Sequence, residues 1–239
     1  ASAWVGVTFY AIQIYCDFSG YTDIVIGLGR ILGFKLMDNF RQPYLATSIS
    51  DFWQRWHISL SFWLRDYLFL PISYRVMDRL DRAKRIFGKV EVWGYLVATF
   101  ITMTICGLWH GARWTFVLWG VLHGLLMIGS LLSRKIRKRI VKRSGLKKRT
   151  GLHRFLKVIS TFSIVSILWV FFRAETVDQA LLVFSRLFSA PGELIKNGHL
   201  AGMQLTDLYI AFFLIGVLMM IEFFRFPCHF LMHFCLTVR

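Results

Sequence analysis

The sequence predicts an all-α fold, namely a polytopic transmembrane helical bundle that includes re-entrant or in-plane helices. Hydrophobic residues make up 56% of the 239 residues, and the chain contains 23 Phe and 9 Trp. This composition is too apolar for a soluble domain of this length. Long uncharged runs recur along the chain, and a helix needs about 20 mainly apolar residues to cross a bilayer. Composition and runs together therefore predict an integral membrane protein.

The uncharged runs mark the expected spans. They cover residues 1–16, 92–109, 114–132, 158–172 and 208–221. The last two reach spanning length by including Lys157 or Glu222 at their ends, so we expect four spans after residue 90. The first run has no initial Met and no basic n-region, and it does not match a signal peptide. We expect 1–239 to be a single integral membrane domain, the C-terminal fragment of a longer protein.

The basic residues predict the orientation of the chain. A formal net charge of +16 would suggest nucleic acid in a soluble protein, but here the charges gather between apolar runs, so no nucleic-acid partner is expected. Residues 134–157 hold 12 of the 29 Lys and Arg, and residues 75–89 hold six more. The positive-inside rule predicts that both are cytoplasmic loops and that the charge-balanced loop 174–204 is extracytoplasmic. Residues 134–157 also suit anionic membrane lipid, which is compatible with the first interpretation.

Charged residues also occur in YCDFSGYTDIVIGLGRILGF, residues 15–34. The small residues in this stretch let helices approach closely. Asp17, Asp23 and Arg30 must face the protein interior or water, and Asp23 and Arg30 lie two turns apart on one helix face. We favour a buried structural ion-pair network, with a functional role as the alternative.

A second polar cluster is SDFWQRWHISLSFWLRDYLFLP, residues 50–71. It is too charged for a lipid-facing span, so we expect an in-plane or re-entrant helix on the cytoplasmic side that ends at Pro71. Arg55 with Asp51, and Arg65 with Asp66, are expected to pair. An interfacial anchor helix explains the Trp residues and a functional site explains His57, and the residues alone do not decide between these two interpretations.

The third cluster is ICGLWHGARWTFVLWGVLHG, residues 105–124. Because both basic loops are expected on one side, the two surrounding runs should form a hairpin with its turn at residues 107–113. His110 lies in that turn. Irregular backbone at membrane depth requires surrounding protein or a water-filled cavity, and an ionisable group there is a functional candidate. We therefore favour a functional role for His110.

The other histidines have structural interpretations. His123 lies between Gly120 and Gly124, where an interhelical hydrogen bond within a tightly packed pair is the favoured role. His229 and His233 share a helix face and could bind a metal, but no acid accompanies them in an HExxH pattern. We therefore expect interfacial histidines there and no metal site.

Three motifs carry a resemblance to a known family. They are YCDFSGYTDIVIGLGRILGF, DNFRQPYLATSISDFWQRWHISLSFWLRDYLFLPI and GLWHGARWTFVLWGVLHG, in that order within residues 15–124. They resemble the membrane-bound O-acyltransferase family, and within it the branch that acetylates alginate and peptidoglycan. Residues 134–239 are similar mainly in hydropathy. The resemblance implies a multi-pass protein of the bacterial inner membrane, which passes an acyl group from a cytoplasmic thioester donor towards an extracytoplasmic hydroxyl.

The resemblance also implies site residues. The invariant His of the family's WHG motif falls on His110, and its second key position falls on His57 in RWHISLS. These two are the expected catalytic residues. The expected substrate-binding residues are Trp109, Arg113, Arg55, Asp17 and Asp66. The acyl thioester, similar to acetyl-CoA, is a donor substrate, and no bound cofactor is expected.

The chemistry agrees with these residue types. Acetylation of a hydroxyl requires removal of its proton, and His suits that task near neutral pH, so His110 is the expected general base. The oxyanion needs hydrogen-bond donors, and His57, the Trp109 indole and backbone amides near Gly111 are unranked candidates. The sequence contains no G-x-S-x-G nucleophile elbow. That favours direct transfer, or transfer through a short-lived acyl-histidine, over an acyl-serine route.

The resemblance implies two further partners, a polysaccharide acceptor and an extracytoplasmic acetyltransferase. The loop 174–204 carries Phe184, Leu187 and Phe188 on an expected amphipathic helix, which would dock that transferase or lie on the membrane surface. Two other classes remain open. A transporter or channel would also bury His, Asp and Arg in a polytopic bundle, and a structural scaffold would recruit an external enzyme.

Overall fold

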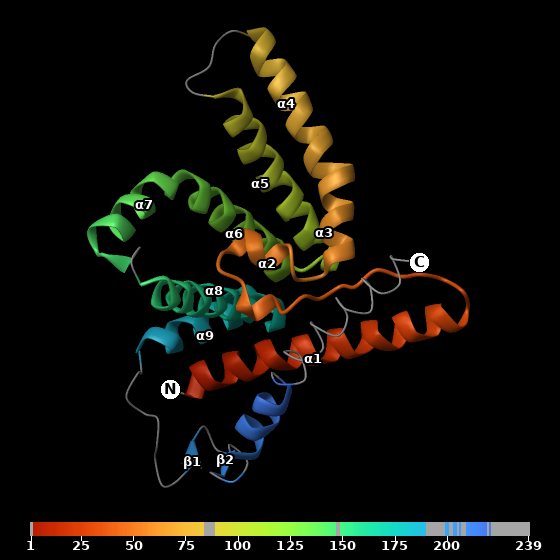
Figure 1. Cartoon of the computed structure of the whole chain (residues 1–239), viewed down its shortest axis with the longest axis vertical. Coiled ribbons are helices and arrows are strands. Elements are labelled where there is room, and N and C mark those ends of the chain that lie inside the picture. Colours follow the sequence, from red (N-terminus) through yellow and green to blue (C-terminus); the bar gives the residue numbers. More distant parts are fainter. Residues whose placement is uncertain are drawn as a thin grey trace. The chain divides into compact units, whose positions relative to one another are not determined.

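A computed structural model describes residues 2–83, 89–146, 149–189, 199–200, 203–204, 206, 209–218 and 220 (Figure 1). Helices dominate these residues, which confirms the all-α class. The chain divides into two compact units. One is Val7–Phe184, and the other combines Ala1–Gly6 with Ser185–Arg239.

Three helices of the larger unit are long and apolar enough to cross a membrane. They are α5 (Val90–His110), α6 (Trp114–Leu132) and α8 (Thr150–Arg173). They confirm that three of the four runs expected to span after residue 90 form helices of spanning length and composition. The fourth run contains a shorter apolar helix, Tyr209–Leu218. Residues 219 and 221–239 lie outside the described residues, so the fourth span stays a prediction.

Helices α5 and α6 form the expected hairpin and pack closely where glycines replace side chains. A Cβ on Gly107 would collide with the backbone oxygen of Phe116, and a Cβ on Gly120 would collide with that of Met103. Gly107 is therefore a packing residue inside α5, and the prediction that the turn begins there is wrong. The helix continues to His110 because the missing side chain serves close packing rather than a turn, and Gly111, with φ 154°, breaks it.

Helix α1 (Ser2–Ile31) leaves the charged groups of its C-terminal half exposed. Tyr15 is buried, but Asp17, Asp23 and Arg30 are all exposed. The favoured prediction of a buried ion-pair network is therefore wrong. Apolar side chains on the same half are exposed as well. Little of the described chain covers this part of the helix, which explains why its charged side chains are exposed.

Residues 50–71 form several elements rather than one helix. These are α2 (Ile49–Trp53), α3 (Ile58–Leu64), the π-helical turn η2 (Arg65–Phe69) and α4 (Leu70–Ala83). The prediction that Pro71 ends the element is wrong, because Pro71 is the second residue of α4. Proline has no backbone N–H, and the π turn directly before it lets the hydrogen-bond ladder change register, so the helix continues.

The two basic segments are largely helical rather than loops. Residues 75–83 belong to α4, which packs along α5 (Figure 1). Residues 134–157 contain α7 (Arg134–Arg143) and the first turns of α8. Lys and Arg are good helix formers, which explains why charge density does not prevent helix formation here. The cytoplasmic side of both segments stays a prediction.

The smaller unit joins the two ends of the chain. The Trp4 indole Nε1 donates a hydrogen bond to the backbone oxygen of Leu187 at 3.0 Å. Leu187 lies on α9 (Val177–Ser189), which confirms the expected helix in 174–204. Leu187 is buried and Phe188 is exposed.

Two short strands follow α9. Strand β1 (His199–Leu200) pairs antiparallel with β2 (Met203–Gln204). His229 and His233 lie outside the described residues. Their expected interfacial role therefore stays a prediction.

Candidate functional site

His110 lies where the α5–α6 hairpin breaks. It is the last residue of α5, and its imidazole packs edge-on against Trp119 and Phe172, with ring centroids 5.2 Å and 5.0 Å away. The side chain is half-buried. Within the described part of the chain, no hydrogen bond reaches its ring nitrogens. Aromatic rings thus fix the plane of the imidazole while leaving its nitrogens available.

His57 lies in the turn between α2 and α3. Its backbone adopts the left-handed conformation, with φ 45° and ψ 57°. That conformation costs a non-glycine residue about 1–2 kcal/mol, so the surroundings must hold it. Phe18 of α1 packs edge-on at 4.8 Å, and Nδ1 of His57 lies 3.4 Å from Oδ1 of Asn39. Burial, and secondarily the neighbouring His110, lowers the pKa of His57 to about 4, so this side chain is neutral at pH 7.

Trp109 connects the two histidines. Its ring centroid lies 6.4 Å from that of His57 and 4.9 Å from that of His110. The indole is 61% exposed, so one face of this group remains accessible. The structure therefore brings together three residues that come from two separate motifs of the sequence.

This arrangement corrects the expected position of His57 along α5. We expected residues 50–71 on the cytoplasmic side, together with the N-terminal end of α5. The structure instead places His57 at the opposite end of that helix, beside Trp109. A helix of 21 residues is about 30 Å long, so the two ends are far apart. Helix α4 runs along α5 and returns the chain across this distance, with Phe69 packing on Tyr95.

An aromatic wall surrounds His110 and was not identified from the sequence. Trp119 of α6 stacks on Trp169 of α8 at 5.6 Å, and both contact Phe172. The run LWVFF in α8 was the available signal. This run is equally consistent with an apolar surface that faces lipid, and for that reason the sequence alone did not identify the aromatic wall.

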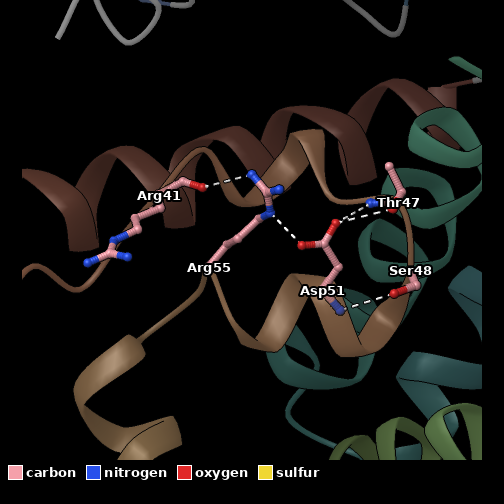
Figure 2. Close-up of polar contacts among 5 residues, drawn as sticks. All are labelled: Arg41, Thr47, Ser48, Asp51 and Arg55. Carbon is pink, nitrogen blue, oxygen red and sulfur yellow. Dashed lines mark hydrogen bonds and ion pairs between the residues drawn. The ribbon is translucent and has the colours of Figure 1, made fainter. Parts of the chain in front are cut away.

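A polar network holds the segment before His57 (Figure 2). Arg55 Nε donates to Oδ1 of Asp51 at 2.6 Å, which confirms the expected pair, and its Nη1 donates to the backbone oxygen of Arg41 at 3.4 Å. Thr47 donates to Asp51 Oδ2 from its backbone and hydroxyl, and Ser48 caps α2 by accepting from Asp51 N. Burial opposes ionisation of Asp51, but the bonds from Arg55 and Thr47 outweigh it and lower its pKa. Arg55, expected to bind substrate, is thus engaged within the chain.

The remaining expected substrate-binding residues are exposed. Arg113 places its guanidinium 4.4 Å from the ring centroid of Phe116. Asp66 pairs with Arg65 at 2.7 Å on the π-helical turn, which confirms that pair. On α1, Phe18 makes the contact with His57, whereas its neighbour Asp17 is exposed.

His123 is fully buried and makes an interhelical hydrogen bond as expected, but its partner lies on α2 and not in the α5–α6 pair. The indole Nε1 of Trp53 in α2 donates to Nδ1 of His123 in α6 at 3.2 Å. Its ring also packs edge-on against Trp119 at 4.8 Å. These contacts agree with the prediction that His123 joins two helices through a hydrogen bond.

The geometry suits acid–base chemistry on a bound substrate. One half-buried imidazole has available nitrogens, a second is neutral at pH 7, and the ring of Trp109, which carries an N–H donor, lies near both. Among the described residues, no group of three or more His, Cys, Asp or Glu is arranged to hold a metal ion.

Comparison with known proteins gives a consistent set of matches. The model of MBOAT, the membrane-bound O-acyltransferase family, matches residues 1–174. The "Probable alginate O-acetylase AlgI" of Pseudomonas putida is 35% identical over 226 residues, which are 93% of this chain and 42% of that protein. The "Peptidoglycan O-acetyltransferase" of Helicobacter pylori is 37% identical over 80% of this chain and 32% of its own length. The "Teichoic acid D-alanyltransferase" of Bacillus subtilis is 36% identical over 49% of this chain and 28% of its own. The chain thus spans less than half the length of these relatives.

Proposed function

Because this chain belongs to the membrane-bound O-acyltransferase family, we propose that it forms part of an enzyme that transfers acetyl groups to hydroxyls of a cell-envelope or exported polysaccharide. The donor is a cytoplasmic thioester of the acetyl-CoA kind, and the enzyme lies in a bacterial inner membrane. The names of two relatives support this, since one is an alginate O-acetylase and the other a peptidoglycan O-acetyltransferase. The three apolar helices support a membrane location.

The observation that carries the proposal is the meeting of His57, Trp109 and His110. A general base must lie within hydrogen-bond reach of the proton it removes, and its nitrogen must be available. His110 meets the second condition within the described chain and lies at a helix break. It is also close to a second imidazole and an indole N–H, which oxyanion stabilisation would use.

His110 acts as the base in a direct transfer. Its ring nitrogen takes the proton of the acceptor hydroxyl while the oxygen attacks the thioester carbon, so that a C–O bond forms and the carbonyl oxygen becomes negative. His57, the Trp109 indole and amides near Gly111 are the candidate donors to that oxyanion. When the tetrahedral intermediate collapses, the C–S bond breaks and the thiolate receives the proton from His110. Atoms and charge balance without any other reactant.

Arg113 contributes positive charge beside this site. Its guanidinium lies over Phe116, whose ring centroid is 6.3 Å from that of His110. A cation there attracts an anionic donor or acceptor polymer as it approaches. Arg113 is therefore the proposed substrate-binding cation, with Trp109 as the exposed aromatic surface.

Two partners complete the proposal. Helix α7 has seven basic residues among its ten and exposes Ile136 and Ile140 one turn apart, which suits the surface of a membrane with anionic lipid on the cytoplasmic side. On the opposite side, the exposed Phe188 of α9 is the proposed contact for an extracytoplasmic acetyltransferase that works beside this enzyme. Crosslinking from residue 188 to a co-expressed transferase tests this contact, and labelling of lipid alone would contradict it.

The activity is tested with the purified full-length parent protein in proteoliposomes. Acetyl-CoA labelled in the acetyl group is supplied on one side and an acetyl-free polysaccharide on the other. We expect labelled ester on the polymer that depends on both substrates. If label crosses the membrane without forming an ester, the protein is a transporter and the proposal fails.

A further inference from the structure

A short antiparallel pairing fixes the position of His57. Backbone N–H of Arg41 donates to the oxygen of Arg55 at 3.0 Å, and N–H of Ile58 donates to the oxygen of Asn39 at 3.1 Å. Phe40 and Trp56 form the bridge between these two bonds. The pairing places Asn39 beside the left-handed residue His57.

The amide oxygen of Asn39 is identified by its partners. Backbone N–H of Ser59 donates to it at 3.1 Å, and a backbone N–H can only donate, so the atom facing it must be the acceptor Oδ1. The hydroxyl of Ser59 donates to the same oxygen at 2.6 Å. Nδ1 of His57 lies 3.4 Å from this oxygen.

This geometry bears on which nitrogen of His57 carries the proton. An oxygen that can only accept attracts Nδ1–H, here as a third and longer contact beside the two bonds from Ser59, and repels a lone pair on Nδ1. In neutral imidazole a proton on Nδ1 leaves Nε2 with a lone pair and no hydrogen. Such a ring accepts a hydrogen bond at Nε2 and cannot donate one to an oxyanion.

We propose that Asn39 is a positioning residue that holds neutral His57 in the Nδ1–H tautomer, so that His57 accepts a hydrogen bond from an O–H or N–H group of the substrate. The inference rests on the proposed function, because it assigns a role within that site. It leaves the Trp109 indole N–H and the amides near Gly111 as the donors to the oxyanion. His57 then orients a substrate rather than stabilising the developing charge.

The tautomer is measured directly, without any acyl transfer. The full-length parent protein is labelled with ¹⁵N-histidine in lipid, and the His57 resonances are assigned by their loss in His57→Gln. We expect a protonated Nδ1 and an unprotonated Nε2 in the wild type, and a rise of the Nε2–H form in Asn39→Ala. Asn39→Asp keeps an acceptor at this position and should keep a proton on Nδ1. A wild-type ring protonated on Nε2 would overturn the proposal even if the Ala variant does not accumulate.

The matched control is Ser59→Ala. It removes a hydrogen bond to Oδ1 of Asn39 but leaves that oxygen facing His57. We expect the wild-type tautomer in this variant, whereas an Nε2–H shift as large as in Asn39→Ala would mean that Asn39 acts only on the local fold, and would refute the proposal.

Acyl-transfer rates complete the test. Asn39→Ala should lower acyl transfer at least about tenfold, because a base or acceptor held in the wrong tautomer loses its function, and Asn39→Asp should restore part of it. KM values measured separately for the thioester and for the polysaccharide show which substrate His57 holds. An unchanged rate in Asn39→Ala, with the tautomer shifted, would refute the role in catalysis. Failure of the proposed function would instead appear as no acyl transfer by the wild type.

Discussion

His110 and His123 lie on the same helical hairpin, and their surroundings differ in one respect that matters for chemistry. His123 is fully buried in the middle of α6, and Nδ1 accepts a hydrogen bond from Trp53. His110 is half-buried at the end of α5, and no described residue hydrogen-bonds to its ring. The first ring is used to join two helices, whereas the second is held only by aromatic contacts. A histidine in an apolar helix is therefore best judged by what its nitrogens bind.

Removal of the His110 ring should have the largest effect on activity. His110→Ala, made in the full-length parent protein, deletes a proton-transfer step worth about 10²–10⁴ in rate. The ring lies at a helix end and supports no hydrogen bond within the described chain, so the protein should still insert and accumulate. Polymer acetylation and the membrane-inserted amount are measured together. Acetylation at the wild-type rate would remove the catalytic assignment.

A substitution of Gly107, which lies where α5 packs on α6, tests the packing of the hairpin that carries both histidines. A Cβ on Gly107 would strike the backbone oxygen of Phe116, which cannot move without shifting α6. We expect Gly107→Ala to destabilise the protein by about 1–3 kcal/mol, the usual range for overpacking. Thermal unfolding in detergent measures this.

The matched control is Gly129→Ala on the same hairpin. A Cβ at Gly129 meets nothing within 4 Å, so this variant should be neutral or slightly stabilised by its better helix propensity. Equal unfolding temperatures for the Gly107 and Gly129 variants would show that the helices are not in close contact at Gly107.

The sequence predicted the elements that depend on local patterns. The spans α5, α6 and α8 follow from apolar runs, and the pairs of Arg55 with Asp51 and Arg65 with Asp66 follow from proximity along the chain. The predictions from the sequence failed where the structure depends on contacts between residues far apart in the chain. Asn39 lies 18 residues before His57, and only the pairing of their segments brings the two side chains together. No local pattern reports that pairing, and DNF between two apolar stretches reads as an ordinary loop.

The prediction of the position of His57 along α5 was wrong for the same reason. A run of mixed Trp, Arg and Asp is typical of a membrane interface. In the structure, His57 meets Trp109 at the C-terminal end of α5, and α4, which follows His57 in the chain, packs along α5 and leads towards its N-terminal end. The sequence pattern predicts a helix before residue 84, but it does not show at which end of α5 the preceding segment with His57 lies.

The pH dependence of stability is expected to report the burial of His57. Burial lowers its folded-state pKa to about 4, below the ordinary value of 6.5. Its contribution to stability is therefore complete above pH 6.5 and is lost as the pH falls from 6.5 towards 4, because the unfolded chain binds the proton more readily. The unfolding temperature of the wild type should fall more between pH 7 and pH 5 than that of His57→Gln. Identical falls would contradict the burial of His57.

Replacement of His123 should have the smallest effect on activity, which makes it the sharpest test of the comparison. In His123→Gln the amide oxygen can still accept from the Trp53 indole, so the rate of acetylation should stay within about threefold of the wild type. Stability should fall by about 1 kcal/mol, a common effect of a single substitution, because Gln loses the ring packing of the fully buried imidazole. Trp53→Phe removes the donor instead and leaves the imidazole. The double variant should lose less stability than the sum of the two single losses, because both substitutions affect the same contact. Acetylation and thermal unfolding are compared for all three proteins. A tenfold loss of rate in His123→Gln, with normal accumulation, would place this ring in the reaction alongside His110, and an engaged nitrogen would then no longer distinguish a structural histidine from a reacting one.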